Sequence, residues 1–135
     1  MIKINQTRFG EGKGNCFASC VCCILEIEDP ESVPNFCFAV PEKEDWWAFF
    51  VSWLKKNHQL DAKFTFTSDE DEETILSGRW NNKIKPPFII SGHNHEGIMH
   101  SVVYCPDNTI WNTNRTCKGL VDVVDIIYFV PGIKK

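Results

Sequence analysis

The sequence predicts an α+β fold in which N-terminal helices pack on an antiparallel sheet. Two apolar stretches with helical spacing, at residues 16–27 and 46–54, dominate the first part of the chain. The second half alternates short apolar runs with turn residues such as Pro106-Asp107-Asn108, a pattern typical of hairpin-linked strands. We expect strands at residues 62–67, 88–92, 98–105, 109–112 and 124–130.

Length and composition indicate a single domain that spans residues 1–135. A chain of this length buries a core without disulfides, and 43% hydrophobic with 24% charged residues is typical of a soluble protein. The net charge of −4 argues against binding to a nucleic-acid backbone, which depends on clustered Lys and Arg. No apolar run approaches the roughly 18 residues of a membrane span. We therefore expect neither nucleic acid nor membrane as a partner, and the oligomeric state stays open.

Seven cysteines raise the question of what each thiol does. The number is odd and the opening residues lack an apolar signal-peptide core, so we expect a cytoplasmic protein with reduced thiols. Cys20, Cys22 and Cys23 fall within a helix that is apolar around most of its circumference. Their simplest role is core packing.

Cys16 differs from the other cysteines because it follows a glycine-rich turn and stands at the predicted start of the first helix. Asn15 is a suitable N-cap residue. The unpaired N–H groups and the dipole at a helix start favour a thiolate, and Gly14 allows backbone N–H groups to approach a ligand. We therefore interpret Cys16 as a candidate nucleophile.

The remaining elements follow from their turn and capping residues. Residues 2–9 are expected to be extended, and Asp45 is expected to cap the helix at 46–54. Ser68 resembles the cap of a short acidic helix that continues to about Ser77. Residues 93–97 form a polar loop before the strand that carries His100.

A nucleophilic cysteine needs a base and a group that orients the base. His100 is the best candidate base, because it begins a strand and can project toward a cleft. Asn112 lies across the predicted hairpin, within reach of His100, although Asn114 has the same direction in an extended strand. Gln6 has a side-chain amide that can donate to an oxyanion.

The loop residues His93 and His95 are possible metal ligands together with Glu96, Cys105 or Cys117. Their spacing is not that of a structural zinc site, and the thiol chemistry needs no metal. We therefore expect no cofactor.

Three segments resemble a known family. They are residues 6–20 with the Gly-Asn-Cys opening, residues 33–36 (VPNF) and residues 97–103 (GIMHSVV). A cysteine at a helix start, then a strand histidine, then an Asn resembles the papain-like cysteine peptidase superfamily, above all its small members such as the C39-like and NlpC/P60-like domains. The narrower motifs are similar to those of short bacterial and phage proteins.

The resemblance implies a papain-like fold and a thiol hydrolase or acyl transferase with the catalytic residues Cys16, His100, Asn112 and Gln6. The substrate would be a peptide or a small amide, contacted by Gly14, Asn15, Gly97 and Met99. This chain has Asn112 where the similar proteins commonly carry Asp, so imidazolium would lack a charged partner. A binding module with weak or no catalysis is the alternative.

Overall fold

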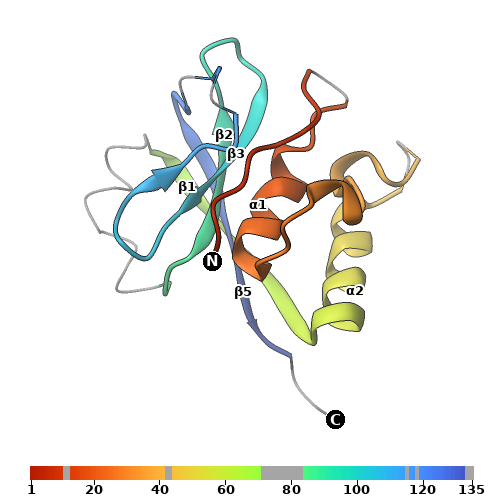
Figure 1. The fold of residues 1–135 in the computed structure, drawn as a ribbon. Coiled ribbons are helices and arrows are strands. Elements are labelled where there is room, and N and C mark those ends of the chain that lie inside the picture. The colour runs from red at the N-terminus through yellow and green to blue at the C-terminus, as the bar shows by residue number, and fades with distance from the viewer. Residues whose placement is uncertain (11–12, 42–43, 71–83, 115, 118, 133–135) are drawn as a thin grey trace.

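The structure is a computed structural model that describes residues 1–10, 13–41, 44–70, 84–114, 116–117 and 119–132. Within these residues the fold is α+β, with helices on an antiparallel sheet (Figure 1). The helical elements are α1 (Cys16–Leu25), η1 (Pro30–Ser32), η2 (Phe36–Phe38) and α2 (Trp46–His58), where η marks a 3₁₀ helix. The strands are β1 (Leu60–Glu70), β2 (Phe88–His93), β3 (Met99–Tyr104), β4 (Ile110–Trp111) and β5 (Val123–Pro131).

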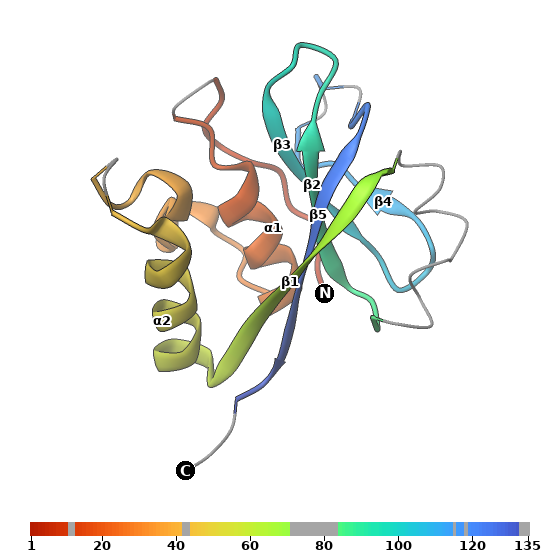
Figure 2. The same cartoon turned by 180° about the vertical axis from the view of Figure 1, so that it is seen from behind.

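The sheet has the strand order β1-β5-β2-β3-β4, and every neighbouring pair is antiparallel. Figures 1 and 2 show α1 and α2 on the same side of this sheet. Helix α1 packs against β2 and β3, and α2 packs against β1. This packing holds α1 against β2, which ends at His93, and β3, which carries His100 near its start.

Helix α1 forms from an almost wholly apolar segment, and its residues 17–23 are buried. It ends at Glu26, which adopts a left-handed conformation with φ 61° and donates its backbone N–H to the Cys22 carbonyl. Cys20, Cys22 and Cys23 are fully buried, so their predicted role in core packing is confirmed.

The predicted cap of α2 is also confirmed. The Asp45 carboxylate accepts hydrogen bonds from the backbone N–H groups of Trp47 (3.0 Å) and Ala48 (3.3 Å). Lys55, Lys56 and His58 occupy the last turn, where positive charge complements the helix dipole.

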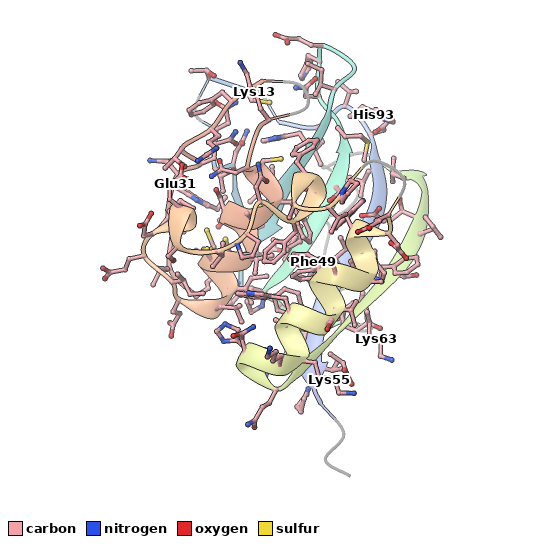
Figure 3. All side chains as sticks on the ribbon, turned by 90° about the vertical axis from the view of Figure 1, so that its right-hand side faces the viewer. Lys13, Glu31, Phe49, Lys55, Lys63 and His93 are labelled. Atoms are coloured by element: carbon pink, nitrogen blue, oxygen red, sulfur yellow. The ribbon has the colours of Figure 1, made fainter. Side chains whose placement is uncertain are left out.

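Aromatic side chains fill the space between the helices and the sheet. The Phe50 ring lies 5.0 Å from Phe17 and 4.8 Å from Phe36, centroid to centroid, in edge-on geometries. The sheet contributes Ile89, Val103 and Ile127 to this core. Figure 3 shows the crowded side chains around Phe49 on α2.

The opposite face of the sheet has its own core, because neighbouring strand residues point to opposite faces. Ile90, Val102 and Ile126 lie there, one residue along from the helix-facing side chains. Phe88 and Tyr104 stack with 4.7 Å between ring centroids.

Residues 2–9, which were expected to be extended, belong to no strand of the sheet, and the backbone N–H groups of Ile2 and Gln6 donate to the carbonyls of Cys23 and Thr113, both at 2.9 Å. Ser68 was expected to cap a helix, but residues 68–70 continue β1, which pairs with β5. The rest of that expected helix, residues 71–77, lies outside the described residues.

Asn112 was expected on a strand, but β4 ends at Trp111. The asparagine therefore stands in the turn that follows the strand. In the portion of the chain that the structure describes, no helix is both long enough and apolar enough to cross a membrane.

Candidate active site

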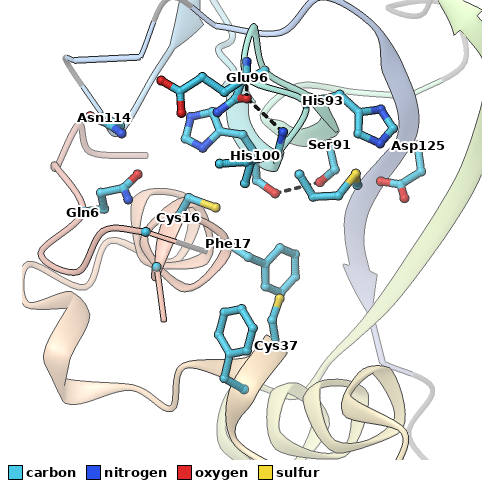
Figure 4. A pocket seen from close by; sticks show the side chains of 18 of the residues that line it. Gln6, Cys16, Phe17, Cys37, Ser91, His93, Glu96, His100, Asn114 and Asp125 are labelled. Atoms are coloured by element: carbon cyan, nitrogen blue, oxygen red, sulfur yellow. Dashed lines mark hydrogen bonds between the residues drawn. The ribbon is translucent and has the colours of Figure 1, made fainter. Parts of the chain in front are cut away.

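A pocket opens between the start of α1 and the helix-facing side of the sheet (Figure 4). Its volume of about 760 Å³ is suited to a small molecule or a few residues of a peptide. The pocket is formed by residues from 6–10 and 14–17, η2, the start of α2, β2 with the following loop, β3 and β5. The lining residues used below are Gln6, Gly14, Cys16, Ser91, Glu96, Gly97, Met99, His100, Ser101, Asn114 and Asp125.

Cys16 is the first residue of α1, and its thiol lines the pocket. Burial raises the pKa of the Cys16 thiol, while Ser101 and the backbone N–H groups of Cys16 and Phe17 partly counteract that rise. The hydrogen bonds at the helix start therefore stabilise the Cys16 thiolate, but by less than burial destabilises it. The resting side chain is a thiol, which needs a base before it can attack.

His100 is the second residue of β3, and only 6% of it is exposed. Burial lowers the pKa of His100, so its imidazole is neutral at neutral pH and carries a single N–H. Its Nε2 lies 2.8 Å from Oδ1 of Asn112. Of the two candidate asparagines, the structure brings Asn112 to the histidine.

The neighbours of Asn112 determine which way its amide points. Nδ2 donates to the Cys117 carbonyl (2.9 Å), and Oδ1 accepts the backbone N–H of Asn114 (3.0 Å). If the amide were flipped, Oδ1 would face the Cys117 carbonyl oxygen, and Nδ2 would face the backbone N–H of Asn114. The first contact would join two acceptors and the second would join two donors. Oδ1 therefore accepts a hydrogen bond from the Nε2–H group of His100, and Nδ1 of the neutral ring carries the lone pair.

Asn114 has a different role. Its Oδ1 accepts hydrogen bonds from the backbone N–H (3.0 Å) and the hydroxyl (2.7 Å) of Thr116. Because its own backbone N–H bonds to Asn112, it shapes the turn that positions Asn112. Its side chain also lines the pocket.

Gln6 is buried at one end of the pocket, beside Cys16 in Figure 4. Its Oε1 accepts from the Thr113 hydroxyl (3.1 Å), and its Nε2 donates one proton to the Arg8 carbonyl (2.9 Å). An amide nitrogen carries two protons, so the second remains for a ligand. These two hydrogen bonds fix the orientation of the Gln6 side chain at the pocket wall.

Asn15 occupies the N-cap position of α1, but its side chain makes no cap hydrogen bond, so that prediction is wrong. Its Oδ1 accepts from the backbone N–H groups of Thr7 (3.1 Å) and Arg8 (2.9 Å), and Nδ2 donates to the Thr7 hydroxyl (2.9 Å). Asn15 is 2% exposed and does not line the pocket, so it fastens the Gln6 segment to α1 instead of contacting a substrate.

The other predicted contact residues do line the pocket. Gly14 lies beside Cys16, and Gly97 and Met99 lie at the rim, where Met99 is 51% exposed. Gly97 has φ +78°, a conformation that favours glycine, and its backbone N–H donates to the Asn94 carbonyl (3.0 Å). The loop between β2 and β3 therefore forms one wall of the site.

The pocket residues that the sequence analysis missed include the polar side chains of Ser91, Ser101 and Asp125. They are cross-strand neighbours on β2, β3 and β5, and the two serine hydroxyls lie 2.8 Å apart. The available signal was a polar residue inside an otherwise apolar strand. Asp125 within the run VVDIIYFV is the clearest case.

His93, which was considered as a metal ligand, pairs with Asp122 instead. Its Nδ1 lies 3.0 Å from the carboxylate, and its backbone N–H donates to the same group (2.8 Å). Both contacts with His93 lower the pKa of Asp122. Gly92 permits this approach, because a Cβ there would collide with the Asp122 carbonyl oxygen. The described residues contain no cluster of three potential metal ligands.

Comparison with protein-family models, with curated proteins and with solved structures finds no match to this chain. The class is therefore defined by the architecture alone: an α+β protein with a thiol, an imidazole and an amide around one pocket.

Proposed function

We propose that this protein is a papain-like thiol hydrolase or acyl transferase that acts on an amide bond of the peptide, isopeptide or γ-glutamyl type. The observation that carries the proposal is the contact between His100 and Asn112 beside a pocket lined by Cys16. That contact selects the imidazole tautomer that can remove a proton from a thiol. The order along the chain, helix-start cysteine, strand histidine and then asparagine, supports the same fold family.

In the first step, Nδ1 of His100 takes the thiol proton as Cys16 Sγ attacks the carbonyl carbon. The developing oxyanion accepts hydrogen bonds from the Cys16 backbone N–H and from the second Nε2 proton of Gln6. When the C–N bond breaks, the imidazolium returns its proton to the leaving amine. The product is a thioester on Cys16.

In the second step, water or another amine loses a proton to His100 and attacks the thioester carbonyl. The C–S bond breaks, and the sulfur recovers the proton from the imidazolium. Water gives hydrolysis and an amine gives acyl transfer. Asn112 keeps the ring in place during both steps but supplies no charge to the imidazolium.

The test is the pH dependence of Cys16 alkylation by iodoacetamide, mapped by mass spectrometry in the wild type and in His100→Ala. Because the proposal makes His100 the base that takes the thiol proton as Cys16 attacks, we expect Cys16 to be alkylated faster in the wild type than in His100→Ala. The difference should shrink as pH rises and Cys16 ionises without help. Equal labelling rates in the wild type and in His100→Ala across the pH range would contradict the proposal.

A binding module on the same scaffold is the second candidate. Two observations favour it: burial raises the pKa of Cys16, and no hydrogen bond joins its sulfur to His100 in the described residues. The variant Cys16→Ala distinguishes the candidates. It abolishes turnover by a hydrolase, whereas ligand binding to a binding module survives.

A further inference from the structure

The catalytic residues occupy only part of the pocket. Figure 4 shows Gln6 and Asn114 on one side of Cys16, and Ser91, His93 and Asp125 on the other. The second side has no function in the mechanism above. Its chemistry bears on which substrate the proposed hydrolase accepts.

Asp125 is an unusual residue for its position. It lies opposite Ser91 on β2 and Phe66 on β1. The Ser91–Asp125 pair is two residues along the strands from the apolar pair Ile89 and Ile127, so both pairs share one face of the sheet. Its Oδ1 is buried and has no hydrogen-bond partner among the described residues. Burial raises the pKa of Asp125, and a hydrogen bond with Ser91 partly counteracts that rise. The protein therefore stabilises the carboxylate incompletely, and a cationic group bound beside it would stabilise it further.

The carboxylates of Asp125 and Glu96 line the pocket, and among the described residues no Lys or Arg does so. Asp122 lies nearby but is already paired with His93. The aromatic side chains of Phe17, Phe38 and Trp46 also line the pocket, and aromatic faces attract cations.

We infer that the pocket selects substrates that carry a cationic group, an ammonium or a guanidinium, on the Asp125 side of the scissile amide. This inference rests on the proposed function, because it assigns a substrate class to the same site. The selecting force is the negative potential of Asp125 in a partly desolvated pocket, with Glu96 adding to it at the exposed rim. An anionic substrate is disfavoured by the same potential.

The test measures the potential at Cys16 directly with three methanethiosulfonates of similar size. Their 2-substituents are trimethylammonium, hydroxyl and sulfonate. Each forms a disulfide with Cys16 and releases methanesulfinate, so no added oxidant is needed. The rate of Cys16 modification by each reagent is measured at pH 8 and low salt by mass spectrometry, and it is divided by the rate of the same reagent with the free thiol 2-mercaptoethanol. We expect the normalised rate of the trimethylammonium reagent to exceed that of the sulfonate reagent by about tenfold.

The variant Asp125→Asn is expected to reduce this ratio several-fold, since it removes the charge and retains the shape. Asp125→Ser, which imitates the neighbouring Ser91–Ser101 pair, should do the same and serves if the amide variant folds poorly. Asp107→Asn is the matched control, because Asp107 is an exposed carboxylate in the β3–β4 turn and should leave the ratio unchanged.

A wild-type ratio equal to that of 2-mercaptoethanol would overturn the inference, and so would a ratio that both Asp125 variants leave unchanged. The latter result would show that Asp125 does not set the potential at Cys16. These outcomes are independent of catalysis, since a change in the ionisation of Cys16 affects all three reagents equally. Failure of the proposed function is recognised separately, by Cys16 reactivity that does not depend on His100.

Discussion

Asn112 is the residue on which the candidate site depends, because it selects the tautomer of His100. We expect Asn112→Ala to lower the rate of Cys16 alkylation near pH 6 by about tenfold or more, since the imidazole can then rotate and change tautomer. Asn114→Ala is the matched control. It removes an amide two residues away that bonds to Thr116 rather than to His100, so its effect on the rate should be much smaller.

Equal losses in the two variants would show that the turn as a whole, and not the contact with His100, supports the thiol. The assay is the same iodoacetamide labelling, with circular dichroism to verify folding. A variant with an intact far-ultraviolet spectrum and a slower reaction identifies a chemical effect.

Burial of His100 also makes stability depend on pH. Its pKa in the folded state lies below the ordinary value of 6.5, so between these two values the unfolded chain binds more protons. The contribution is complete above pH 6.5 and is lost as pH falls through the folded pKa. We expect the free energy of unfolding in urea to decrease from pH 8 to pH 5.5, and His100→Gln to show a weaker decrease.

The difference between the stability curves of the two proteins is the informative quantity, because it separates the contribution of His100 from that of the other titratable groups. Parallel curves for wild type and His100→Gln would contradict the buried neutral imidazole. A steeper curve for the wild type supports it.

At the scale of elements, α2 offers the clearest test of a local rule. The Asp45 carboxylate satisfies two backbone N–H groups at the start of the helix. We expect Asp45→Ala to reduce the free energy of unfolding by about 1 kcal/mol, and Asp45→Asn to have a much smaller effect because Asn is an equally good N-cap. Urea denaturation of the three proteins provides the comparison, and equal losses in both variants would indicate that the charge matters more than the cap.

Helix α1 follows a different rule at its start. Asn15 has the residue type of an N-cap, but its side chain bonds to Thr7 and Arg8, and the fold gains a tether between the Gln6 segment and the helix. Asp45 and Asn15 both precede the first residue of a helix and both are residue types that favour the N-cap position. They differ because residues 7–8 pack beside Asn15 and take its side-chain hydrogen bonds, whereas Asp45 bonds to its own helix.

At the scale of the whole molecule, one aromatic core joins both helices to the sheet. Phe50 is fully buried among rings from α1, η2 and β5. We expect Phe50→Ala to reduce the free energy of unfolding by about 3–5 kcal/mol, the usual range for a buried Phe. Phe66→Ala is the matched control, because Phe66 is 68% exposed and should change stability by less than about 1 kcal/mol.

Phe50→Ala should also slow the reaction of Cys16, since α1 is held above β3 by this core. Unchanged stability of Phe50→Ala in urea would contradict the packing described here. Unchanged Cys16 reactivity with lost stability would show that the site depends on α1 and β3 alone.

The sequence by itself determined the α+β class, both helices and the strands from residue 88 onward, and it singled out Cys16 and His100, which the structure places in one pocket. These features are local: apolar periodicity, capping residues and turn residues act over a few positions, so they can be read without knowing the fold. The burial of Cys20, Cys22 and Cys23 followed from the same periodicity.

Only the tertiary structure decided which asparagine meets His100, what Asn15 does, and that residues 68–70 continue a strand. Each depends on a partner distant in sequence: Cys117 orients the Asn112 amide, Thr7 binds Asn15, and β5 pairs with β1. Asp125 and Ser91 lie 34 positions apart and become neighbours only through strand pairing. These contacts join residues that are far apart in the sequence. Periodicity, capping residues and turn residues describe only a few neighbouring positions, so they do not predict such contacts.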